Sequence, residues 1–116
     1  MLLKGVNDDV DVLAELMRAF VACRIKPYYL HHADLAPGTG HLRTSIKTGQ
    51  DLARQMRGHL SGLCQPAYML DVPGGAGKVP IGPSYIAAAG AGAEDGYEVR
   101  TLSGDLRVYP PPIREV

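Results

Sequence analysis

The chain has 116 residues, and its 12 Lys and Arg balance 12 Asp and Glu, so the formal net charge is zero. Hydrophobic residues make up 46% and charged residues 21%, which is close to an average globular protein and excludes a disordered polar chain. Without clusters of Lys or Arg, we expect neither nucleic acid nor a membrane as a partner. No apolar run reaches the roughly 18 residues of a membrane span, and the N-terminus lacks the pattern of a signal peptide, so we expect a cytoplasmic protein.

The first predicted element is a helix over about residues 8–24. From Val10 onward, apolar residues recur at three- and four-residue spacing, and the acids before them suit a helix N-terminus. Pro27 ends this helix, because a proline biases the preceding residue away from helical backbone. The apolar residues 28–30 then predict a buried strand, and Asp34 follows it.

The same order repeats once along the chain. Thr44 or Ser45 caps a second predicted helix, which Gly62 stops. Residues 66–70 predict the next strand, and Asp71 comes directly after it. Alternating helices and strands favour parallel strands, yet two strands alone cannot make a parallel sheet that is covered on both faces.

The predicted fold class is therefore α/β, in two parts. Residues 1–83 are expected to be the C-terminal portion of a partial (β/α) TIM-like barrel, and residues 84–116 a small antiparallel β meander. Between the last barrel strand and the meander, residues 72–78 are too glycine-rich for a helix or a strand and predict a loop. The meander is expected from segments 85–89, 97–102 and 106–109, which turn sequences at 92–96 and 103–105 join.

Asp34 and Asp71 each follow a predicted strand. The carboxyl ends of parallel strands in α/β barrels are where binding and catalytic side chains collect, and two carboxylates there suit an ammonium ligand. The alternative is that each aspartate only caps the turn behind its strand. Recurrence at the same place in both repeats favours a substrate-binding pair.

Lys78 ends the glycine-rich segment and is a candidate phosphate ligand or amine nucleophile. A phosphate loop needs a glycine six positions before the lysine and Ser or Thr after it, but Val72 and Val79 occupy those places. The sequence therefore favours a lysine that forms a Schiff base, against the alternative of a solvated loop lysine. Because His31 and His32 are adjacent on a strand and point to opposite faces, we assign no metal site.

Five sequence blocks can be read together: Gly5-Val6-Asn7-Asp8, Arg24-Ile25-Lys26-Pro27-Tyr28-Tyr29-Leu30 with Asp34, His41-Leu42-Arg43-Thr44, Arg57-Gly58-His59-Leu60-Ser61-Gly62, and Leu70-Asp71-Val72-Pro73-Gly74-Gly75-Ala76-Gly77-Lys78. In this order and spacing they resemble the C-terminal region of the lysine 2,3-aminomutase family. The resemblance covers about residues 2–110, and several blocks in register are far more specific than any single motif.

The resemblance implies a radical S-adenosylmethionine isomerase, which converts L-lysine to β-lysine through an imine on pyridoxal phosphate. It implies that Lys78 is the catalytic lysine that binds pyridoxal 5′-phosphate, and that Asp34 and Asp71 bind the distal ammonium of the substrate. The family's CxxxCxxC motif, which holds the 4Fe-4S cluster that cleaves S-adenosylmethionine, is absent from the sequence. The ligands of the cluster and of S-adenosylmethionine are therefore not in this chain.

Two accounts of this short chain stay open. We expect either a gene fragment or truncated gene model, or a split subunit that a second chain carrying the N-terminal radical half would complete. The alternative functions are a non-catalytic remnant that binds pyridoxal phosphate or an amino acid, a structural α/β domain without a cofactor, and the branch that forms (R)-β-lysine for elongation factor P. Paired aspartates favour lysine over glutamate and related amino acids as the substrate.

Overall fold

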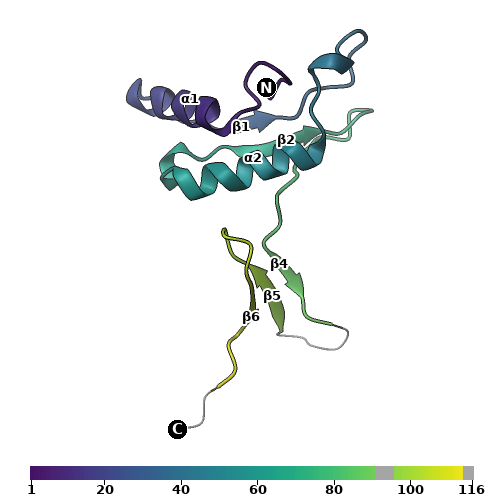
Figure 1. The fold of residues 1–116 in the computed structure, drawn as a ribbon. Coiled ribbons are helices and arrows are strands. Elements are labelled where there is room, and N and C mark those ends of the chain that lie inside the picture. The colour runs from purple at the N-terminus through teal and green to yellow at the C-terminus, as the bar shows by residue number, and fades with distance from the viewer. Residues whose placement is uncertain (91–95, 114–116) are drawn as a thin grey trace. The chain divides into compact units, whose positions relative to one another are not determined.

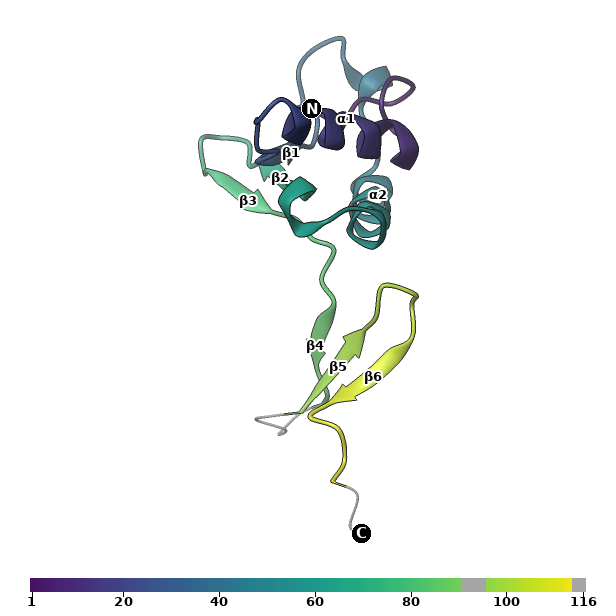
Figure 2. The ribbon, with the colours of Figure 1, turned by 90° about the vertical axis from the view of Figure 1, so that its left-hand side faces the viewer.

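The computed structural model describes residues 1–90 and 96–113, which form a mixed α/β fold as predicted (Figures 1 and 2). The chain divides into two compact units, Met1–Pro83 and Ser84–Val116. The described residues contain two α-helices and two three-stranded sheets, with both helices in the first unit. No helix in that part of the chain has the length and apolar character needed to cross a membrane.

Helix α1 spans Val10–Ala22 and is shorter than predicted by about one turn in total. It begins after Asp9, whose carboxylate accepts hydrogen bonds from the backbone N–H groups of Asp11 and Val12. These are two of the donors that the first turn of a helix leaves unpaired. Leu13, Ala14 and Met17 are the residues that the helix buries.

Helix α2 spans Ile46–His59. Its N-cap is Ser45 rather than Thr44, because the Ser45 hydroxyl accepts a hydrogen bond from the backbone N–H of Thr48 at 3.0 Å. The helix ends before the predicted stop, and the short 3-10 helix η2 (Gly62–Cys64) follows it. The predicted helix therefore exists, with both ends placed by local hydrogen bonds.

The first sheet has the strand order β1-β2-β3. Strands β1 (Tyr29–His31) and β2 (Ala67–Asp71) are parallel, and Leu30 lies opposite Tyr68. Strand β3 (Lys78–Pro80) is antiparallel to β2. The parallel pair agrees with the sequence prediction, whereas the TIM-like barrel remains a prediction, because the described residues hold only this one parallel pair.

Strand β3 corrects the prediction of one loop over residues 72–78. Lys78 is the first residue of β3, so the glycine-rich segment is the turn of a β-hairpin. A strand of three residues with a proline carries little sequence signal. Pro80 is compatible with β3 because this strand lies at the edge of the sheet, where a missing backbone donor is tolerated.

The prediction of a buried strand at residues 28–30 is wrong for two of the three residues. Tyr28 is 68% exposed and Tyr29 is 40% exposed, while Leu30 is 3% exposed. Leu30 belongs to the core cluster that the two helices complete. Successive residues of a strand point to opposite faces, so Tyr29 lies on the sheet face that the helices do not cover.

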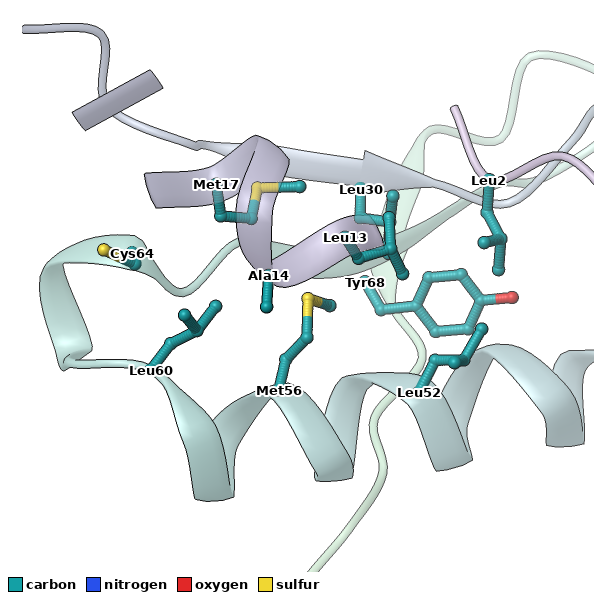
Figure 3. Packing of buried hydrophobic residues seen from close by; sticks show 10 residues of the cluster. All are labelled: Leu2, Leu13, Ala14, Met17, Leu30, Leu52, Met56, Leu60, Cys64 and Tyr68. Carbon is teal, nitrogen blue, oxygen red and sulfur yellow. The ribbon is translucent and has the colours of Figure 1, made fainter. Parts of the chain in front are cut away.

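The core of the first unit lies between the helices and the sheet (Figure 3). Leu2 is fully buried in it, and its backbone N–H donates a hydrogen bond to the carbonyl of His31 at 2.8 Å, so the N-terminal segment runs beside β1. Cys64 is buried in the core. The cluster consists of Leu2, Leu13, Ala14, Met17, Leu30, Leu52, Met56, Leu60, Cys64 and Tyr68.

The second unit is an antiparallel sheet, which agrees with the predicted meander. Its strands are β4 (Ile86–Ala88), β5 (Tyr97–Arg100) and β6 (Leu106–Tyr109), in the order β4-β5-β6. Gly104 has a φ of 95° in the predicted turn between β5 and β6. The other predicted turn, at 92–96, lies outside the described residues except for its last position.

Candidate functional site

Asp34 and Asp71 lie at the carboxyl ends of two neighbouring parallel strands. Asp34 follows β1, and Asp71 is the last residue of β2 rather than the residue after it. Residues 34–36 and 71–75 line one cleft of about 380 Å³, so the structure brings both aspartates to the same cleft. Both side chains belong to exposed residues, and neither forms an ion pair with a described residue. Their charges are therefore accessible to a ligand.

Lys78 lies directly opposite Asp71 in the β2–β3 pairing. The N–H of Val72 donates to the carbonyl of Gly77 at 2.9 Å, so the next pair, Asp71 with Lys78, is a pair without backbone hydrogen bonds. Opposed side chains approach closest at such pairs and share one face of the sheet. Lys78 is not part of the cleft lining, but it is a cross-strand neighbour of one of its carboxylates.

The turn before Lys78 is open on its outer side. Gly74, Gly75 and Gly77 have φ values of 84°, 73° and 96°, which residues with a side chain rarely adopt. A Cβ at any of the three would have no atom within 4 Å. The backbone beside the exposed Lys78 is therefore accessible to a ligand.

Arg43 contacts the backbone of Asp34. Its Nη2 and Nε atoms donate to the Asp34 carbonyl oxygen at 2.9 and 3.3 Å. Arg43 follows the 3-10 helix η1 (Gly40–Leu42), which includes His41. Neither His41 nor Arg43 lines the cleft.

A buried polar pair lies behind the candidate site, and sequence reasoning did not find it. His32 Nδ1 is 2.7 Å from the Tyr68 hydroxyl, and both residues are buried. Burial lowers the pKa of His32, and the nearby Arg43 charge lowers it further, while Asp34 acts in the opposite direction. Burial also raises the pKa of Tyr68. The sequence did hold one signal for this pair, because His32 lies two residues before Asp34, a predicted site residue.

The described residues contain no group of three His, Cys, Asp or Glu side chains arranged to hold a metal ion. His32 faces Tyr68 inside the core region, and His31 stacks edge-on against Tyr29 with ring centres 5.8 Å apart. The two cysteines are also in different environments: Cys23 is exposed, and Cys64 is buried.

These features define a class of protein: a mixed α/β protein in which two aspartates at the ends of parallel strands line one cleft, with a lysine opposite one of them on a glycine-rich hairpin. Residues 53–115 match the family profile described as lysine-2,3-aminomutase. That match covers more than half of the chain, and the chain belongs to the lysine 2,3-aminomutase family.

Individual relatives agree with this assignment. The L-lysine 2,3-aminomutase of Clostridium subterminale is 39% identical over 113 residues, which are 97% of this chain and 26% of that protein. The L-lysine 2,3-aminomutase of Bacillus subtilis is 35% identical over 112 residues, 97% of this chain and 23% of that protein. The glutamate 2,3-aminomutase of Clostridioides difficile is 35% identical over 106 residues, 91% of this chain and 24% of that protein. The chain thus spans about a quarter of the length of these relatives.

Proposed function

We propose that the chain supplies the substrate-ammonium site and the cofactor lysine of a 2,3-aminomutase that acts on L-lysine in the cytoplasm. The observation that carries this proposal is the cleft shared by Asp34 and Asp71, with Lys78 opposite Asp71 on the adjacent strand. The names of the relatives support the reaction class. In this proposal, β1 and β2 are two strands of the larger TIM-like barrel of the whole enzyme.

The two aspartates favour a cationic substrate. Two carboxylates at one cleft repel each other, and a positive charge between them relieves the repulsion. The distal ammonium of lysine supplies that charge, whereas the distal carboxylate of glutamate would add a third negative charge. Holding this end of a flexible substrate also fixes the position of its reacting carbons. Lysine is therefore the expected substrate, although one relative is named a glutamate 2,3-aminomutase.

Lys78 is the residue that would hold pyridoxal phosphate. When bound, this cofactor supplies the π-system over which a radical on the substrate is delocalised. The open hairpin turn leaves room for the cofactor, and the exposed Lys78 amine has no ion-pair partner among the described residues.

The residues of this chain do not fit the 4Fe-4S cluster. Its two cysteines are 41 positions apart in sequence, one exposed after α1 and the other buried in η2. We assign the ligands of the cluster and of S-adenosylmethionine to the part of the relatives that the chain does not span. A polypeptide carrying that part is therefore the expected partner.

Pyridoxal phosphate attachment tests the role of Lys78. The sequence has four lysines, at positions 4, 26, 47 and 78. After incubation with pyridoxal phosphate and reduction with borohydride, peptide mass spectrometry is expected to find the cofactor mainly on Lys78. Lys78→Ala should abolish that label. Lys47→Ala is the matched control, because Lys47 is 82% exposed and pairs with Asp51 at 3.1 Å. Equal labelling of all four lysines would contradict the assignment.

A further inference from the structure

We propose that Arg43 is a positioning residue, which holds Asp34 at the ammonium cleft by binding its backbone carbonyl. This inference rests on the proposed function of Asp34. It concerns a residue outside the cleft lining, whose only hydrogen bonds in the described structure are to the loop that carries Asp34.

Side-chain hydrogen bonds connect the two ends of the loop over residues 34–43 and also its middle. The Arg43 guanidinium donates twice to the Asp34 carbonyl, and its Nη2 also lies 3.4 Å from the hydroxyl oxygen of Thr39. That hydroxyl donates in turn to the carbonyl of Ala36 at 2.7 Å. The first three residues of this loop line the cleft. Arg43 thus holds the segment 34–36, which lines the cleft and includes Asp34.

The guanidinium binds the carbonyl of Asp34 and not its carboxylate. In the described residues, the Asp34 side chain has neither an ion pair nor a hydrogen bond, although a cation is bonded to the same residue. Arg43 therefore orders the backbone without occupying the charge that the substrate ammonium needs. A guanidinium suits this task because its rigid fork reaches one acceptor with two N–H groups, which the single ammonium of lysine does not do.

Two accounts of Arg43 predict opposite effects on ligand binding. If Arg43 acted only through its charge, it would repel an ammonium ligand, so Arg43→Gln would tighten binding and Arg43→Lys would leave it unchanged. If Arg43 positions Asp34, both substitutions weaken binding, because both lose the two-donor contact. The sign of the change separates the two accounts.

Titration of the full chain with L-lysine, at concentrations where it is monodisperse, measures this sign. We expect Arg43→Lys and Arg43→Gln each to weaken lysine binding about threefold, which is less than the effect of removing an accessible carboxylate partner. Arg54→Gln is the matched control, since Arg54 lies on α2, pairs with Asp51 at 3.4 Å and does not touch the loop. Unchanged or tighter binding in the Arg43 variants would overturn the proposal.

Hydrogen exchange of backbone amides tests the positioning role without any ligand. The N–H groups of Leu42 and Arg43 donate to Thr39 and Gly40 within the loop, at 2.9 and 3.2 Å. We expect Arg43→Lys to reduce protection at these two amides and to leave the Leu60 amide at the end of α2 unchanged. Intact protection would refute the positioning role. Reduced protection in a chain that does not bind lysine would instead refute the proposed function alone.

Discussion

At the residue scale, His32 links the stability of the first unit to pH. Its side chain is 7% exposed and contacts the Tyr68 hydroxyl, with Arg43 close enough to disfavour a second positive charge. The pKa of His32 is therefore lower in the folded protein than its ordinary value of 6.5, so the unfolded chain binds this proton more tightly. The contribution of neutral His32 to the free energy of unfolding is complete above pH 6.5, and it is lost as the pH falls toward the lowered pKa.

Urea unfolding over a series of pH values from about 7.5 to about 5 measures this dependence. We expect the free energy of unfolding to fall below pH 6.5, and we expect the fall to be smaller in His32→Gln, which cannot take up the proton. An identical slope in the His32 variant would show that His32 is not the group responsible.

The positions of Asp34 and Asp71 could be predicted from the sequence because each follows an apolar run, and the ends of parallel strands meet at one edge. The contacts that hold Asp34 could not be predicted in the same way. Arg43 is nine residues away along an irregular loop, and its partner is a backbone carbonyl, which any residue provides. Only the folded loop shows that these two groups meet.

At the scale of elements, the packing of α2 against β2 depends on a glycine. Gly49 is buried in the helix, and a Cβ at this position would overlap the hydroxyl and ring of Tyr68. Tyr68 is 3% exposed and bonded to His32, so it has little freedom to move away. A helix interior normally disfavours glycine by about 1 kcal/mol relative to alanine. Here the close contact between helix and strand outweighs that preference.

Two substitutions on the same helix should therefore have opposite effects. Gly49→Ala is expected to destabilise the chain by about 1–3 kcal/mol, as overpacking of a filled core does. Gly58→Ala should stabilise it by up to about 1 kcal/mol, because a Cβ there meets nothing within 4 Å. Chemical unfolding of both variants checks the signs, and stabilisation by Gly49→Ala would contradict the packing described for Tyr68.

Helical periodicity and capping residues were sufficient to predict α1 and α2, and turn sequences were sufficient for the strands of the second unit. Strand β3 was missed because three residues that include Pro80 are too few to show the alternating hydrophobic pattern of a strand. Its formation also depends on pairing with β2. Its absence from the prediction also hid the placement of Lys78 opposite Asp71. That relation is set by hairpin register and cannot be obtained from spacing alone.

At the scale of the whole molecule, the described fold contains only part of what the relatives contain. The chain covers 23–26% of the lengths of the three relatives compared above. Large apolar side chains such as Leu35, Leu63 and Ile113 are exposed in the described structure. Both observations agree with the proposal that Asp34, Asp71 and Lys78 act within a larger assembly, in which other residues would supply the radical chemistry.

The central claim is that Asp34 and Asp71 together bind the ammonium of a substrate. Calorimetric titration of the unsubstituted chain, Asp34→Asn and Asp71→Asn with L-lysine tests it most directly, with L-norleucine as the ligand that lacks the distal ammonium. We expect lysine to bind more tightly than norleucine, and each substitution to weaken lysine binding about fivefold, as for accessible ion pairs, without changing norleucine binding. Because both carboxylates act on one ammonium, the double substitution should weaken binding less than the product of the single effects. Equal binding of lysine and norleucine, or unchanged lysine binding in both variants, would contradict the account.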